Sequence, residues 1–355
     1  MNMLDYINET QQSCINIIKN RKEVTNKIST VLSDKKINRI VLVASGSSFN
    51  AMNSVKFFIE EYLKVEVVIV VPYMFEHYDN SFNENSIVIG VSQSGRSTST
   101  INAMKLAKKK GLITFVITLN TKSEITKYVD NVIDLGCGVE TVEYVTKGYT
   151  ATVLNMMLIA LEGALARGSI TEEEYSELLK QIELTVLGMH NIIDRSEEFF
   201  KNNKDDFKDA ERLMVIGYGS NYGTALEGAL KIGETVRIPA TGYEVEEFMH
   251  GPYLELTDKH LVIFIDSNGR VKDRILHLNN YINMVTEKAY LISNTSQGKI
   301  DKEIIVDFEG NEFINPLELA IPFQVFAYRM CEARGIDLTV EPLADFERTL
   351  KSKVF

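Results

Sequence analysis

Runs of β-branched and aliphatic residues alternate with longer stretches of helical periodicity along most of the chain. The first runs cover residues 39–43, 66–70, 87–91 and 114–118, and further runs cover 213–216, 261–265 and 289–292. Continuous apolar strands separated by helices are typical of a parallel sheet that helices cover on both faces. We therefore predict an α/β fold.

The second set of strands repeats the first at an almost constant spacing. Four pairs of residues around the end of a first strand are 173 positions apart: Arg39 and Arg212, Gly46 and Gly219, Ser47 and Ser220, and Phe49 and Tyr222. After a later strand, Gly95-Arg96 and Gly269-Arg270 are 174 positions apart. We interpret this spacing as a duplicated α/β domain. The alternative is a chance similarity between Gly-Ser turns, which are common in such folds.

The domain boundaries follow from this repeat. A chain of 355 residues suggests about two domains, at roughly 150 residues each. We expect a helical segment, a first domain, a helical connector, a second domain and a tail, at residues 1–36, 37–166, 167–209, 210–330 and 331–355.

Charge and composition exclude several classes of protein. The net charge of −11 has the wrong sign for a nucleic-acid binder. The longest apolar stretch, near residues 65–71, ends at Pro72, and no basic segment leads into an apolar one at the start of the chain, so we expect neither a membrane span nor export. Cys14, Cys137 and Cys331 are widely spaced with no CxxC, which predicts free thiols in the cytoplasm.

Two loops rich in hydroxyl groups follow predicted strands. Ser45-Gly46-Ser47-Ser48 comes after the first strand, and the segment 92–98 comes after the third. The carboxyl ends of parallel strands and the first turns of helices together offer neutral donors to a phosphate monoester. Neither loop has the GxxxxGK[ST] pattern of a P-loop. The alternative is that these side chains are only helix N-caps, but two such loops favour phosphate binding.

The second copy differs from the first at the third-strand loop. It has Asp266-Ser267-Asn268-Gly269 where the first copy has Ser92-Gln93-Ser94-Gly95. A carboxylate would repel a phosphate at that position. We therefore expect the first copy to bind the phosphate and the second to supply other groups.

Candidates for those other groups lie between residues 225 and 252. Lys231 and Glu234 are three residues apart on one helix face, which also fits an ordinary surface pair. His250 precedes Gly251-Pro252 in a turn that can present its side chain to a cleft. The five histidines show no HxH or HExxH spacing, so we predict no metal and no cofactor.

Taken together, these motifs resemble those of the tandem sugar-isomerase (SIS) domain family. The similar proteins are the isomerase half of glucosamine-6-phosphate synthase and stand-alone fructosamine-6-phosphate deglycases. The matching segments are Gly46-Ser47-Ser48, Ser92-Gln93-Ser94-Gly95 with Ser97, Gly138-Val139-Glu140, 146–150, 225–234 and 247–252. The resemblance implies two tandem flavodoxin-like, three-layer αβα SIS domains with parallel sheets.

The resemblance also implies roles for individual residues. The phosphate would be held by Ser47, Ser48, Ser92, Gln93, Ser94 and Ser97. Glu234 would move protons between the first two sugar carbons, with Lys231 beside it, and His250 would assist ring opening. A lysine of the C-terminal tail would contact the open-chain carbonyl or condense with it, completing the active site. The sugar pocket would include Gly46, Glu143, Val145 and Glu247. A homodimer is implied, with the histidine coming from the neighbouring subunit.

Three departures from the family pattern bear on these roles. The tail reads Arg348-Thr349-Leu350-Lys351-Ser352-Lys353-Val354, one residue out of step with the family, so we assign the lysine role to Lys353, with Lys351 second. At 143–145 a glutamate replaces a serine-bearing loop beside the sugar, and Glu143 could recognise an amine. The glutaminase domain of the synthase is not expected, because Cys14 lies within a helical stretch.

We therefore predict a phosphosugar isomerase or deglycase that acts on a 6-phosphorylated amino sugar or fructosamine. One alternative is a sugar-phosphate sensor without catalysis, which would leave Glu234, His250 and the tail lysine unexplained. Another is the isomerase subunit of a split glucosamine-6-phosphate synthase. The partners expected are a small sugar phosphate and a second copy of the chain.

Overall fold

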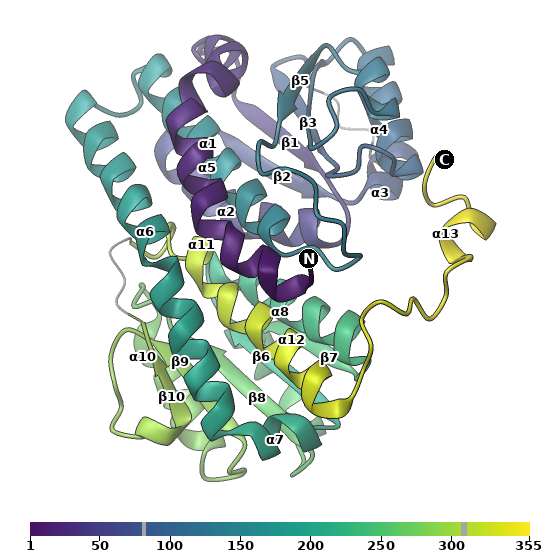
Figure 1. Cartoon of the computed structure of the whole chain (residues 1–355). Helices are drawn as coiled ribbons and strands as arrows, with labels where there is room; N and C mark the ends of the chain where they lie inside the picture. The colour runs from purple at the N-terminus through teal and green to yellow at the C-terminus, as the bar shows by residue number, and fades with distance from the viewer. Residues whose placement is uncertain (80–82, 307–310) are drawn as a thin grey trace. The chain divides into compact units, whose positions relative to one another are not determined.

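The computed structural model describes residues 1–79, 83–306 and 311–355, and these residues form two five-stranded parallel sheets (Figure 1). Each sheet belongs to a separate compact unit. The first-sheet unit comprises residues 12–140, 147–180 and 341–355, and the second-sheet unit comprises residues 1–11, 141–146 and 181–340. The linear domain boundaries given above stay predictions.

The first sheet has the strand order β2-β1-β3-β4-β5. Its strands are β1 (Arg39–Val43), β2 (Glu66–Val70), β3 (Ser86–Val91), β4 (Ile113–Thr118) and β5 (Asn131–Asp134). The helices of this unit are most of α1 (Met3–Leu32), α2 (Ser47–Leu63), α3 (Pro72–His77), α4 (Thr98–Lys109), the 3-10 helix η1 (Glu124–Tyr128), α5 (Lys147–Arg167), the start of α6 (Glu172–Asn202) and α13 (Phe346–Thr349).

The second sheet has the order β10-β9-β8-β6-β7. Its strands are β6 (Arg212–Gly217), β7 (Ala240–Glu244), β8 (His260–Ile265), β9 (Ala289–Ser293) and β10 (Glu303–Ile305). The helices of this unit are the start of α1, the larger part of α6, α7 (Lys204–Asp209), α8 (Asn221–Val236), α9 (Val245–Phe248), η2 (Pro252–Glu255), α10 (Lys272–Ile282), η3 (Ile300–Lys302), α11 (Pro316–Leu319) and α12 (Ile321–Arg334).

When the strands of each unit are counted along the chain, both sheets have the order 2-1-3-4-5. This is the flavodoxin-like order, and it confirms the prediction of two tandem α/β domains with parallel sheets. Three strands escaped the sequence prediction: β5, β7 and β10. All three lie at the edge of a sheet, and β7 carries Thr241, Gly242 and Glu244, so none of them forms the continuous apolar run that marks a strand buried on both faces.

Apolar side chains fill the space between each sheet and its helices. On one face of the first sheet, Val41, Val88 and Val116 pack with Phe75 of α3 and Met104 of α4. Figure 1 shows α3 and α4 on this face, while α2 and α5 pack together on the other. The inner strands β1, β3 and β4 are thus buried on both faces, as their uninterrupted apolar sequences require.

Helix α5 is the one described helix that is long and apolar enough to cross a membrane. Its most apolar window is 83% buried inside the structure, as the core helix of a folded domain would be. The three cysteines are free and buried, which confirms that they are not joined in disulfides. The cytoplasmic location expected from them stays a prediction.

We predict that Gly228→Ala on α8 lowers the free energy of unfolding by about 1–3 kcal/mol. A Cβ atom at this glycine would lie 2.6 Å from Cγ of Phe323 on α12, so the two helices would have to separate. Gly233→Ala on the same helix is the matched control, because its nearest neighbours would be 3.8 Å away. Urea unfolding of both variants checks this packing, and equal stabilities would contradict it.

Candidate active site

The two serine-rich loops of the first-sheet unit follow neighbouring strands. Strands β1 and β3 pair directly in parallel, with Val43 opposite Gly90, so the loops after them leave the same edge of the sheet. Helix α2 begins at Ser47, and α4 begins at Thr98. Backbone N–H groups in the first turns of both helices therefore point toward this edge, where an anion is favoured.

No serine side chain of these loops makes the N-capping hydrogen bond of α2 or α4. The N-cap residue of α4 is Ser97, and its side chain makes no capping hydrogen bond; it accepts a bond from Thr100 Oγ1 at 3.0 Å instead. The N-cap position of α2 is Gly46, which has no side chain. The N-cap alternative is therefore wrong for Ser97. Ser48 and Ser92 are nearly buried, at 8% and 6% exposure, whereas Ser94 is exposed.

A tight turn at Gly95 fixes the shape of the second loop. Gly95 has a φ of +64°, and a Cβ there would lie 1.9 Å from Ser123 Oγ, so only glycine fits. The carbonyl of Gln93 accepts hydrogen bonds from Leu119 N and Thr118 Oγ1, at 2.9 and 3.1 Å. The backbone that carries the predicted phosphate ligands is thus tied to the end of β4.

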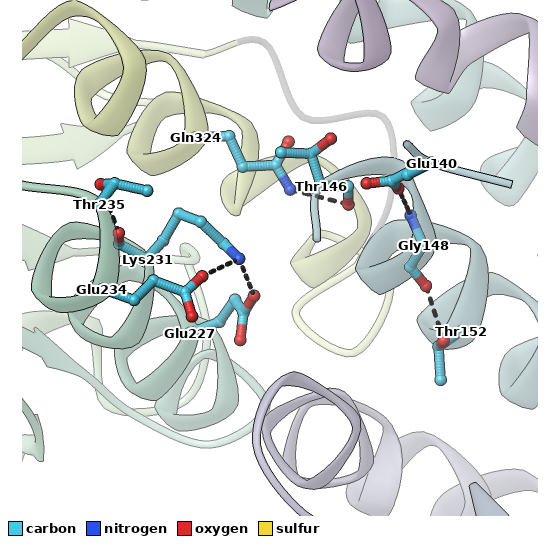
Figure 2. A network of polar contacts seen from close by, with 9 residues as sticks. All are labelled: Glu140, Thr146, Gly148, Thr152, Glu227, Lys231, Glu234, Thr235 and Gln324. Atoms are coloured by element: carbon cyan, nitrogen blue, oxygen red, sulfur yellow. Dashed lines mark hydrogen bonds and ion pairs between the residues drawn. The ribbon is translucent and has the colours of Figure 1, made fainter. Parts of the chain in front are cut away.

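The side chain of Gln93 reaches the first turn of α5. A Cβ on Gly148 would lie 2.9 Å from Gln93 Nε2, which is buried and has no hydrogen-bond partner among the described residues. Gly148 N in turn donates to Glu140 Oε1 at 2.6 Å, and its carbonyl accepts from Thr152 Oγ1 (Figure 2). This close approach links two of the segments that carried the family resemblance, the serine loop and 146–150.

The tail brings both candidate lysines to the serine loop. Lys353 pairs with Ser97 in an antiparallel bridge, and Thr98 N donates to Ser352 O at 3.0 Å. The carbonyl of Lys351 accepts from Thr98 Oγ1 at 2.8 Å. The ammonium of Lys353 forms an ion pair with Glu347 of α13. Lys353 is therefore held beside a predicted phosphate ligand, and the choice between the two lysines stays a prediction.

In the second-sheet unit, α8 carries a lysine between two carboxylates (Figure 2). Lys231 Nζ lies 2.6 Å from Glu234 Oε1 and 3.6 Å from Glu227 Oε1. The spacings of three and four residues place these groups on one helix face. Lys231 and Glu227 are 1% exposed, whereas Glu234 is 32% exposed, so the surface-pair alternative is wrong for Lys231. A solvent-facing carboxylate is thus held by a buried ammonium.

The other candidate residues of the second-sheet unit lie at its surface. His250 follows α9 in a turn and is 69% exposed, with Nε2 3.6 Å from Glu246 Oε1. Glu247 is exposed, and its backbone N–H donates to the Glu244 carboxylate at 3.0 Å. Glu143 is exposed and Val145 half-buried, in the short segment 141–146. That segment is fixed by Gln324 Nε2, which donates to Thr146 O at 3.2 Å (Figure 2).

In the second-sheet unit, the loop equivalent to the serine loop is held by hydrogen bonds to the Asp266 carboxylate. Asp266 is fully buried and accepts hydrogen bonds from Tyr218 Oη, Ser293 Oγ and Asn268 N, at 3.0, 2.8 and 2.8 Å. Burial raises the pKa of the Tyr218 phenol, so this group stays a donor. The Asp266 carboxylate is thus hydrogen-bonded within its own unit, and the expectation that this loop binds no phosphate stays a prediction. The described residues also contain no cluster of three or more possible metal ligands.

Two residues of these sites escaped the sequence analysis. Glu227 is four residues before Lys231 within the Ala225–Glu234 motif, so helical spacing was a signal that could have revealed it. Glu347 gave no such signal, because its pairing with Lys353 depends on the irregular path of the tail.

Comparisons with known proteins identify the relatives of this chain. The family model of the SIS domain matches residues 32–162 and 206–331. The glutamine–fructose-6-phosphate aminotransferase (isomerizing) of Gloeobacter violaceus is 30% identical over 310 residues, which cover 85% of this chain and 50% of that protein. The protein of the same name from Caldanaerobacter subterraneus is 27% identical, covering 91% of this chain and 54% of that protein. The chain thus spans about half the length of these curated relatives.

Solved structures match the chain over nearly its whole length. A candidate phosphosugar isomerase from Clostridium difficile 630 has a TM-score of 0.92 and 30% identity, covering 99% of this chain and 98% of that one. The C-terminal domain of the glucosamine-fructose-6-phosphate aminotransferase from Francisella tularensis has a TM-score of 0.86, covering 95% and 96%. At 23% identity, this second match shows the fold alone.

We predict that Lys231→Met destabilises the protein by about 3–5 kcal/mol, because it leaves the buried Glu227 carboxylate without its ammonium. The double variant Lys231→Met/Glu227→Gln should recover much of this loss, since it removes both charges. Denaturant unfolding measures both effects. A single variant as stable as the wild type would contradict the charge pairing inferred for α8.

Proposed function

Because the chain belongs to the SIS domain family, we propose that it is an enzyme acting on a phosphorylated sugar. In this proposal it moves a proton between the first two carbons of a 6-phosphorylated amino sugar or fructosamine, in an aldose–ketose type of reaction. The names of the relatives support a phosphosugar isomerase. The choice of an amine-bearing substrate rests on the resemblance of the motifs and on the carboxylate of Glu143.

The observation that carries the proposal is the pairing of Lys231 with Glu234. A general base must reach the substrate and must also be held in one orientation. The Glu234 carboxylate satisfies both needs, because it is 32% exposed while its Oε1 lies 2.6 Å from an ammonium that is 1% exposed. The buried ammonium thus fixes the orientation of the Glu234 carboxylate, which distinguishes it from a freely solvated surface charge.

The serine loops supply the second element, a binding site for the phosphate. Ser47, Ser48, Ser92, Gln93, Ser94 and Ser97 offer neutral donors, and the α4 first turn adds backbone N–H groups. The buried, unpartnered amide nitrogen of Gln93 supports this role, since a buried donor gains by finding an acceptor. Binding of this kind needs no metal.

The proposed reaction balances its protons within the site. His250 assists opening of the sugar ring, and Glu234 then takes a proton from one of the first two carbons and returns it to the other through an enediol or enamine. Lys353 stabilises the open-chain carbonyl by contact or as an imine, which accepts electrons from the adjacent carbon. For a fructosamine 6-phosphate, a proton moves from C1 to C2 while the amine proton passes to the C2 oxygen, which yields an imine of the aldose, and water then releases glucose 6-phosphate and the free amine.

Proton NMR of the purified protein with a panel of substrates tests this proposal. The panel contains several fructosamine 6-phosphates, glucosamine 6-phosphate and fructose 6-phosphate. Release of glucose 6-phosphate from an amine conjugate would identify a deglycase, and interconversion without release would identify an isomerase. Binding without turnover of any compound would overturn the enzymatic proposal in favour of a sensor.

We predict that Glu234→Gln lowers kcat by about 10²–10⁴-fold, the usual contribution of general acid–base catalysis. The amide keeps the size of the side chain but removes the basic carboxylate. Glu211→Gln is the control, since Glu211 is exposed and pairs only with Lys259 among the contacts the structure describes. Steady-state rates decide the matter, and full activity of Glu234→Gln would exclude this glutamate as the base.

We further propose a homodimer in which His250 of one subunit serves the reaction of the other. Co-expressed His250→Ala and Glu234→Gln chains should then regain up to about a quarter of wild-type activity, because half of the random dimers carry one intact set of residues. Each variant alone should stay inactive. Light scattering gives the oligomeric state, and a dimer whose mixed variants show no recovery would mean that each chain uses its own histidine.

A further inference from the structure

The C-terminal tail also contacts the serine loop through Arg96, next to the two lysines. Arg96 Nε donates to Val354 O at 2.7 Å, and Val354 N donates back to Arg96 O at 2.8 Å. The Arg96 guanidinium also lies over the ring of Phe355, 4.7 Å from its centroid, and Arg348 approaches the same ring at 5.8 Å. Phe355 is therefore contacted by two cations.

The second-sheet unit contains a similar contact between an arginine and a phenylalanine. Arg270 occupies the position equivalent to Arg96, after the glycine of its loop, and its guanidinium lies 5.0 Å from the centroid of Phe313. Here the neighbouring Glu312 binds the loop: its carboxylate accepts a hydrogen bond from Arg270 N at 3.1 Å and forms an ion pair with the Arg270 guanidinium at 3.0 Å. A segment of its own unit thus docks on each loop, with an Arg–Phe contact in both.

The two copies differ in what the docked segment brings. In the second-sheet unit the segment brings a carboxylate, which would repel a phosphate at that loop. In the first-sheet unit it brings Lys353, two residues before Phe355 and paired with Ser97. The Arg96 contacts are made with Val354 and Phe355, which follow this lysine, whereas its ion pair is with Glu347, which precedes it. The backbone at this lysine is therefore held on the loop by contacts that do not involve its side chain.

We propose that Arg96 and Phe355 form a latch that holds the tail on the serine loop and so positions Lys353 for the reaction. Arg96 is a positioning residue in this account, since it acts through the tail. The role of Lys353 in the reaction rests on the proposed function, but the latch itself does not. Lysine cannot replace Arg96 fully, because a guanidinium combines a directed hydrogen bond with stacking on an aromatic ring.

Hydrogen–deuterium exchange of the full-length protein tests the latch without any substrate. In Arg96→Ala, the amides of residues 350–355 should exchange about tenfold faster or more, as expected for loss of a charged hydrogen bond and a cation–π contact. Phe355→Ala should have a similar effect. The double variant should exchange more slowly than the sum of the two single effects predicts, because both changes remove the Arg96–Phe355 contact. Arg270→Ala is the matched control from the second copy and should leave exchange in the tail unchanged.

Kinetics and phosphate binding then separate positioning from binding. Arg96→Ala should lower kcat about tenfold or more while the Kd for inorganic phosphate stays within about threefold of wild type, and Arg96→Lys should recover part of kcat. Unchanged exchange in the tail of Arg96→Ala, or additive effects in the double variant, would overturn the latch. If the exchange results hold but no sugar phosphate is turned over, the latch stands and the proposed function fails.

Discussion

The parallel pairing of β1 with β3 is the constraint on which the rest of the first-sheet unit depends. It brings the loops that follow these two strands to one edge of one sheet, although the paired positions Val43 and Gly90 are 47 residues apart in the chain. The first turns of α2 and α4, the buried Ser48 and Ser92 and the backbone of the tail all lie at that edge. Local sequence supplies the hydroxyls, but only the strand pairing makes them neighbours.

The two copies share one strand order but differ in the side chains at their third-strand loops. Both sheets have the same strand order, and both third-strand loops are followed by an arginine that lies over a phenylalanine. In the second copy, Asp266 and Glu312 form hydrogen bonds at the loop, and the residues that we propose for proton transfer lie on α8, where Lys231 pairs with Glu234. In the first copy the loop keeps its serines, and a lysine-bearing tail docks beside them.

Sequence patterns predicted those parts of the fold that depend on residues close together in the chain or on the repeat between its halves. The strands buried on both faces show as apolar runs, and the repeat near 173 residues revealed the duplication. The edge strand β7 went unseen because its half-exposed residues include glycine and glutamate. The spacing on α8 pointed to Lys231 and Glu234, yet it could not tell a surface pair from one in which the lysine is 1% exposed. The Arg96 contacts join positions 258 residues apart, so no local pattern could predict them.

The central claim is that Glu234 moves a proton between the first two carbons of a sugar phosphate. Turnover of a fructosamine 6-phosphate or an amino-sugar phosphate in D₂O, followed by NMR, tests it most directly. A half-exposed carboxylate exchanges its proton with solvent, so the account predicts carbon-bound deuterium at position 1 or 2 of the product or recovered substrate, and none with Glu234→Gln. Product formation without carbon-bound deuterium, at the same rate in both proteins, would contradict it.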